Sequence, residues 1–357
     1  MVALATTSIA WVILTIIIVG WILYYILNNR SARPELGSEV ELAPNRKAYY
    51  DDETLEGSRL ERMQVLGVLL LAVLVIALPL YWVLEPGRQA GASAAKDSRF
   101  ADWGGQLFDT TANGGFNCAG CHGGMKGGGG AAAFALLDPK TDEVEQVSWY
   151  APALNTVYYR YSKDEVRFIL EYGRPFSPMS AWGTAGGGPM NSQQIDTLLF
   201  YLERIQIQPA GCIGDESFNS VTFQPCDGGS LPQENRDEIE QAVQKYLSDN
   251  PTASRGQALF NLELGSGAYG CARCHTLGWS YGQPGVTGQG AFGWNLTGGS
   301  TNGKFPSEAD MITFIQNGSE YGKKYGTQGQ GSGRMPGFGS LLTPEDIKAV
   351  VEYVRSL

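Results

Sequence analysis

Histidine is scarce in this chain of 357 residues, which contains only His122 and His275. Zinc hydrolases, Rieske iron–sulfur centres, binuclear copper sites and b-type haems held by two histidines need histidines that the chain lacks. Basic residues are also few, with 26 lysines and arginines against 36 acids. The net charge of -10 argues against nucleic acid as a partner, because neutralising phosphates requires a basic surface.

Charged residues make up only 17% of the chain and hydrophobic residues 43%, which excludes a disordered protein. The length exceeds one typical domain. We therefore expect two domains, or one domain with a membrane anchor.

Charges are absent from two apolar runs near the N-terminus, at 8–27 and 65–84. A helix of about 20 apolar residues crosses a hydrocarbon core of about 30 Å. A cleaved signal peptide is the alternative for the first run, but it would need basic residues before the run and a small-residue cleavage site after it. The first charged side chain is Arg30. We expect a two-helix transmembrane hairpin over 1–86.

Basic residues are concentrated between the two runs, and this fixes the expected topology. They are Arg30, Arg33, Arg46, Lys47, Arg59 and Arg62. The positive-inside rule places this loop in the cytoplasm and both termini outside. The small, polar segment Gly87–Ser98 is expected to be a tether rather than a helix.

Two similar units follow, at 97–206 and 234–357, and indicate an internal duplication. Each has a short helical pattern, Cys-x-x-Cys-His, a glycine-rich loop, a middle helix, a methionine in a turn and a last helix. The linker 207–233 contains Cys212 and Cys226. Outside the cytoplasm, cysteines at this spacing predict a disulfide, and a third redox or metal site is the alternative.

Each Cys-x-x-Cys is followed at once by one of the two histidines, a pattern typical of covalent haem c attachment. Two thiols bond to the vinyl groups on one edge of the porphyrin, and the next residue carries an imidazole beneath the iron. Zinc, a redox-active dithiol and a structural disulfide are alternatives for a single Cys-x-x-Cys. Two copies favour two covalently bound haem c groups. The predicted residues are Cys118, Cys121 and His122 for the first, and Cys271, Cys274 and His275 for the second.

A six-coordinate haem needs a second axial ligand, and methionine is the usual one where histidine is exhausted. Met179 lies 57 residues after His122, and Met335 lies 60 residues after His275. Their contexts, MSAWG and MPGFG, are alike. We therefore predict Met179 and Met335 as the ligands.

The combined pattern resembles class I cytochrome c over both units. It comprises C-x-x-C-H, then M-x-[AG]-[FW]-G, then a last helix of the form L-T-x-x-[DQ]-I-x-x-[LV]-x-x-Y-[LV], in which the first unit has Met-Asn in place of Leu-Thr. The resemblance implies an all-α bundle around each haem, with the first and last helices crossing. It places Phe108, Tyr201, Phe260 and Tyr353 at those crossings, and Asn155 and Asn295 in the haem pockets.

The whole chain is similar to membrane-anchored dihaem cytochromes, among them the dihaem cytochrome c subunit of actinobacterial-type respiratory cytochrome bc complexes. That subunit usually carries its anchor after the haem domains, whereas here the apolar runs come first. The hairpin instead resembles that of subunit II of haem-copper oxidases, but the copper-binding domain of that subunit has no counterpart.

The resemblance implies electron transfer from a quinol-oxidising cytochrome bc complex toward a terminal haem-copper oxidase, without catalysis by this chain itself. The implied partners are cytochrome b and Rieske iron–sulfur subunits, the terminal oxidase or a soluble electron carrier, and membrane lipid. The haem domains are expected outside the cytoplasm. The alternatives are a cytochrome subunit of an oxidase or of a periplasmic dehydrogenase, and a dihaem peroxidase-type enzyme.

Overall fold

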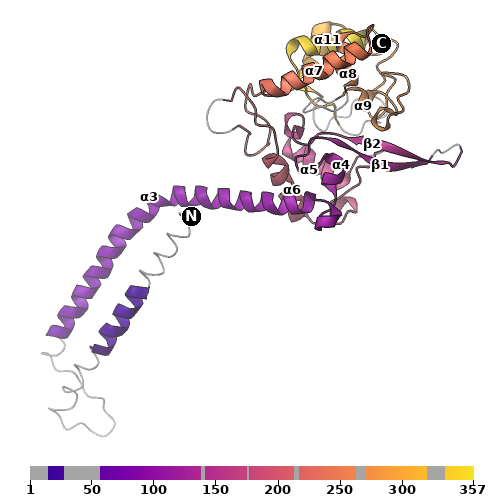
Figure 1. The fold of residues 1–357 in the computed structure, drawn as a ribbon. Coiled ribbons are helices and arrows are strands. Elements are labelled where there is room, and N and C mark those ends of the chain that lie inside the picture. Colours follow the sequence, from indigo (N-terminus) through magenta and orange to yellow (C-terminus); the bar gives the residue numbers. More distant parts are fainter. Residues whose placement is uncertain are drawn as a thin grey trace. The chain divides into compact units, whose positions relative to one another are not determined.

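The computed structural model describes residues 15–27, 57–137, 141–174, 177–212, 217–262, 270–319 and 334–357 (Figure 1). The chain divides into two compact units, Met1–Gly91 and Ala92–Leu357. The second unit carries all of the residues predicted to bind haem.

The first unit is dominated by the apolar part of α3 (Ser58–Phe108). Large apolar side chains along this part are exposed all round the helix, with Trp82 and Val83 about three-quarters exposed. Among the described residues, α3 is the one helix long and apolar enough to cross a membrane, and the helix Thr15–Leu27 is shorter. Part of the predicted span 8–27 and most of the loop after it lie outside the described residues, so the two-helix hairpin remains a prediction.

The segment Gly87–Ser98 is helical, which corrects the expectation of a tether. Helix α3 continues through it to Phe108. The segment contains four alanines, the residue with the highest helix propensity, which offset two glycines that each cost about 1 kcal/mol. Its polarity was misleading, because alanine and lysine suit an exposed helix as well as a loop.

The second unit is mostly helical and contains two sets of equivalent elements (Figure 1). The first set is the end of α3, α4 (Cys118–His122), α5 (Lys163–Tyr172) and α6 (Ser192–Arg204). The second is α8 (Arg255–Asn261), α9 (Ala272–His275), α10 (Glu308–Asn317) and α11 (Pro344–Arg355). The predicted first, middle and last helices of both units are thus confirmed. Helix α7 (Gln233–Asp249), which precedes α8, was not predicted.

Side-chain caps explain where the middle and last helices begin. In each, a polar side chain accepts a hydrogen bond from a backbone N–H of the first turn, which that turn cannot satisfy internally. The capping residues are Ser162, Asn191, Ser307 and Thr343.

The first and last helices of each set cross at a glycine and an aromatic pair. A Cβ on Gly104 would overlap the carbonyl of Thr197, so only glycine allows this approach. Beyond the crossing, the rings of Phe108 and Tyr201 lie 5.0 Å apart. The same positions in the second set are Gly256, Phe260 and Tyr353, with the two rings 5.5 Å apart. The predicted helix-crossing contacts are confirmed in both sets.

A two-stranded antiparallel hairpin corrects the purely α-helical expectation. Strand β1 (Gly130–Leu137) pairs with β2 (Val144–Ala151), so that Gly130 faces Ala151. Valine and aromatic residues in β2 favour an extended conformation. The preceding glycines and alanines had suggested only a loop.

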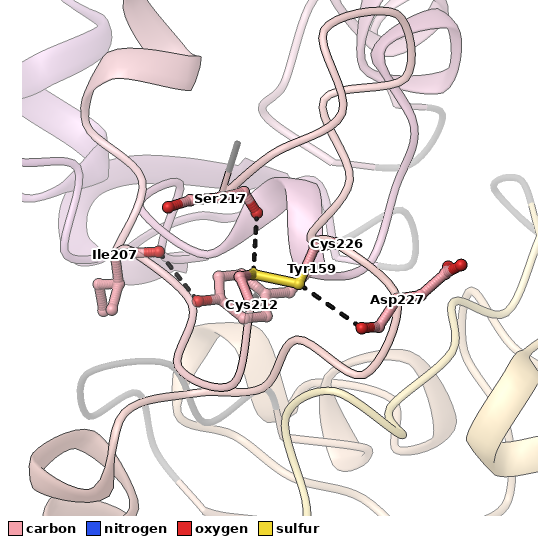
Figure 2. The surroundings of a disulfide bond; sticks show 6 residues. All are labelled: Tyr159, Ile207, Cys212, Ser217, Cys226 and Asp227. Carbon is pink, nitrogen blue, oxygen red and sulfur yellow. Dashed lines mark hydrogen bonds between the residues drawn. A yellow bond between two sulfur atoms is a disulfide. The ribbon is translucent and has the colours of Figure 1, made fainter. Parts of the chain in front are cut away.

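The linker between the two sets packs against its neighbours (Figure 2). A disulfide joins Cys212 and Cys226, whose Cα atoms are 5.7 Å apart. The Tyr159 hydroxyl donates a hydrogen bond of 2.9 Å to the carbonyl of Ile207, where the linker leaves the first set. Phe223, within the disulfide loop, is buried against the ring of Tyr158 at 5.2 Å. The described parts of the linker, 207–212 and 217–233, are therefore folded.

Candidate haem sites

The first Cys-x-x-Cys-His segment forms the single helical turn α4. Positions three apart lie on one face of a helix, which places Cys118 and Cys121 side by side. The turn ends at Gly123, whose φ is 82° and where a Cβ would overlap the carbonyl of Gly129. Glycine is therefore required directly after His122.

The second segment has the same local structure. Cys271 caps α9, and His275 ends it. The cysteines of both segments are partly buried thiols and take no part in disulfides. Each segment thus presents two thiols and one imidazole from about one turn of helix.

Both histidines are oriented by a backbone carbonyl. His122 Nδ1 lies 2.9 Å from the oxygen of Pro152, and His275 Nδ1 lies 2.7 Å from that of Trp294. A carbonyl oxygen can only accept, so Nδ1 carries the proton and donates it in both cases. The lone pair is left on Nε2, the atom that would bind a metal.

The environment favours neutral imidazoles and protonated thiols. Burial lowers the pKa of His122 and of His275 below the ordinary value, which keeps the Nε2 lone pair available at neutral pH. Burial also raises the pKa of Cys118 to about 11 and that of Cys271 to about 12. Thiolates are the reactive form of cysteine, so burial in the folded chain disfavours reaction at these two side chains.

The predicted ligand Met179 lies in a loop held against the end of α5. Helix α5 ends at Gly173, whose φ is 71°. The N–H of Arg174 donates to the carbonyl of Met179 at 2.8 Å, and that of Trp182 donates to Leu170 at 2.9 Å. A Cβ on Gly173 would lie 2.6 Å from the Met179 oxygen, so glycine is needed for this approach.

Met335 is held in the same way against the end of α10. Helix α10 ends at Gly318, whose φ is 75°, and a Cβ there would lie 2.6 Å from the Met335 oxygen. The N–H of Ser319 donates to the carbonyl of Met335 at 2.9 Å, and that of Phe338 donates to Ile315 at 2.9 Å. The two methionines therefore occupy equivalent positions, and both pack partly buried against the core.

The two predicted pocket asparagines differ in their surroundings. The side-chain oxygen of Asn155 is buried without a hydrogen-bond partner, a state expected where a ligand or water completes the site. The side-chain oxygen of Asn295 instead accepts hydrogen bonds from the N–H and the hydroxyl of Thr297. Only Asn155 is thus left with an unsatisfied group.

The donor set of each domain fits a c-type haem. It consists of two thiols, an imidazole with Nε2 available and a thioether in an equivalent loop. No cluster of three or more histidine, cysteine or acidic side chains able to hold a metal ion occurs in the part of the chain that the structure describes.

The Cytochrome c family model matches residues 101–206 and 253–357, which together cover more than half of the chain. The chain belongs to the cytochrome c family. No curated protein and no solved structure matches it. Cytochrome c domains bind haem c and transfer electrons, and two such domains imply two haems in this cytochrome.

Two arginines beside the predicted haem-binding residues of this cytochrome were not indicated by any sequence pattern. Arg273 stands between Cys271 and Cys274, and Arg334 directly precedes Met335. Arg334 pairs with Glu165 on α5 of the first domain, with its Nη2 3.1 Å from Oε2 of that residue. The partners are 169 positions apart, so no local pattern indicates the pair.

Replacing Glu165 with glutamine is expected to lower the free energy of unfolding by about 3 kcal/mol, because it leaves a buried guanidinium without its counter-charge. The two side chains are only 13% and 6% exposed. Glutamine keeps an acceptor for the N–H of Ser162, so the cap of α5 should survive. Chemical denaturation of the full chain in detergent measures the change.

The matched control is Glu240→Gln, which breaks the more exposed pair between Glu240 and Arg255. Pairs of that kind contribute about 0–1 kcal/mol. An equal decrease in the free energy of unfolding in the two variants would contradict a larger contribution of the Arg334–Glu165 pair to stability.

Proposed function

We propose that this cytochrome is a membrane-bound dihaem carrier that moves electrons, one at a time, from a quinol-oxidising cytochrome bc complex toward a terminal haem-copper oxidase. The observation that carries the proposal is the presence of two cytochrome c domains behind a long apolar helix in one chain. Attachment to the membrane would replace diffusional encounter with a high effective concentration near membrane-bound partners.

In this proposal the first haem is held by Cys118, Cys121, His122 and Met179. The second haem is held by Cys271, Cys274, His275 and Met335. Haem iron supplies a reversible one-electron change, and methionine ligation raises its reduction potential. The chain contributes the hydrogen bonds to the imidazole Nδ1 atoms and the backbone bonds that hold both methionine loops.

We further propose that the apolar runs at 8–27 and 65–84 both span the membrane, with the basic loop between them in the cytoplasm. The haem domains then lie outside the cytoplasm, where cytochrome b and Rieske subunits, an oxidase or a soluble carrier can reach them. The Cys212–Cys226 disulfide supports this placement, because disulfides persist in oxidising compartments.

The test is purification of the tagged full-length cytochrome from native membranes. We expect cytochrome b and Rieske subunits to co-purify, and added quinol to reduce both haems in a reaction that a cytochrome bc inhibitor blocks. An enzyme that is itself reduced by a soluble substrate, found in place of these subunits, would favour the dehydrogenase alternative. An oxidase found alone would favour an oxidase subunit. Peroxide consumption by the isolated chain would favour the peroxidase alternative.

A further inference from the structure

The end of strand β2 contacts the haem-binding segments of both domains. The carbonyl of Pro152, the first residue after the strand, accepts the hydrogen bond from His122 Nδ1. The carbonyl of Tyr150, two residues earlier, accepts one from Nη1 of Arg273. One short stretch of backbone therefore joins the imidazole of the first site to the residue between the two cysteines of the second.

Arg273 is suited to hold this junction. Its side chain is buried, with the residue 6% exposed, and its guanidinium lies 5.2 Å from the centre of the Trp279 ring. The ring of Trp279 in turn lies 6.3 Å from that of Tyr150. Burying a guanidinium is costly unless acceptors or ring faces offset the lost water, and here the first domain supplies the carbonyl that accepts from Nη1.

The rest of β2 adds contacts of the same kind. The rings of Trp149 and Tyr281 lie 5.1 Å apart, and Gln283 donates a hydrogen bond of 2.6 Å to Glu145. The first pair joins the strand to the short helical segment Trp279–Tyr281 of the second domain, and the second pair joins it to Gln283, two residues beyond that segment. Several residues of β2 thus contact the stretch of the second domain that follows the second haem-binding segment.

We propose that β2 is a fixed link between the two haem-binding segments, and that Arg273 is the positioning residue that holds the second segment on this link so that electrons pass directly between the haems. The proposal rests on the proposed electron-transfer function. In the step, one ferrous haem iron is oxidised and the other, ferric, iron is reduced. No bond forms or breaks, and no proton moves.

The test compares Arg273→Met with the parent in the full-length dihaem protein. Methionine keeps an apolar side chain of similar reach but cannot donate to Tyr150. The matched control is Arg355→Met, since Arg355 also donates to a carbonyl, that of Phe305 at 3.0 Å, but within the second domain. Arg273→Lys retains a donor and the charge, so its exchange and redistribution rates should lie between those of Arg273→Met and the parent.

Two readouts are needed. The first is amide hydrogen exchange in the peptide that contains 144–152, which should become about tenfold faster in Arg273→Met, as expected for loss of a charge-assisted hydrogen bond. The second is redistribution of a single electron between the haems after a photo-excited flavin reductant delivers it. This redistribution should slow severalfold in Arg273→Met and stay at the parent rate in Arg355→Met.

If Arg273→Met fails to assemble, Tyr281→Ala provides the same test, because it removes the contact with Trp149 and leaves the haem-binding residues intact. If amide exchange and electron redistribution in Arg273→Met or Tyr281→Ala were as fast as in the parent and no faster or slower, the proposed role of β2 and Arg273 would be wrong. This outcome does not depend on whether quinol reduces the protein. The other outcome is a parent protein that redistributes electrons rapidly but is never reduced through a cytochrome bc complex. That result would contradict the proposed function but not the role of β2.

Discussion

Replacing Cys271 and Cys274 together with alanine is expected to leave about one covalently bound haem per chain in place of about two. The second segment then has no thiol to bond to the porphyrin, while the first segment keeps both of its own. Haem content per chain after denaturation, measured spectroscopically, decides the result. The same change at Cys118 and Cys121 should also remove about one haem.

The disulfide cysteines provide the matched control. Replacing Cys212 and Cys226 with alanine removes the same number of cysteines, but from the linker, and both haems should stay attached. A parent protein whose haem extracts into acidified acetone would contradict covalent attachment. Zinc in place of haem would support the metal-site alternative for the Cys-x-x-Cys pairs.

Replacing Met335 with histidine is expected to lower the reduction potential of the second haem by on the order of 100 mV, within the range of about 0.8 V that axial ligands can set. Imidazole donates more strongly than a thioether to ferric iron and so stabilises the oxidised form. Because about 59 mV is tenfold for one electron, the equilibrium constant for electron transfer from the second haem to its acceptor rises by more than tenfold. Redox titration followed by absorbance measures the shift.

Met311→Leu is the control for this measurement. Met311 lies inside α10 and is buried, as a packing residue should be, so its loss should leave both potentials near the parent values. The ferric absorption band characteristic of sulfur–iron ligation should weaken in Met335→His, where only the first haem keeps its methionine, and stay at the parent intensity in Met311→Leu. Unchanged potentials in Met335→His and Met179→His would show that other groups bind the two irons.

The candidate haem sites could be predicted from the sequence because haem attachment fixes the spacing of their residues along the chain. Thioether attachment demands two cysteines and a histidine within five positions, and with only two histidines in the chain no third imidazole can bind either iron. The glycines that end α5 and α10 could have been added to the pattern. Each lies next to the methionine carbonyl and has a positive φ, which glycine adopts without strain.

The contacts between the domains were not accessible in this way. The pair of Arg334 with Glu165 and the bond from Arg273 to Tyr150 join residues 169 and 123 positions apart. Strand β1 is equally obscure, because its alanines have weak strand propensity and it becomes a strand only by pairing with β2. Tertiary pairing, rather than local preference, determines these features.

The Cys212–Cys226 bond also bears on the biogenesis of the protein. If the haem domains mature outside the cytoplasm, the same oxidising compartment must join this pair while the other four cysteines stay reduced until haem arrives. During N-to-C export Cys118 and Cys121 emerge before the linker pair, as exposed thiols that an oxidant can reach. The cell that makes the protein must therefore supply both a thiol oxidant and a reductant to the same exported chain. The order in which they act decides whether haem can be attached.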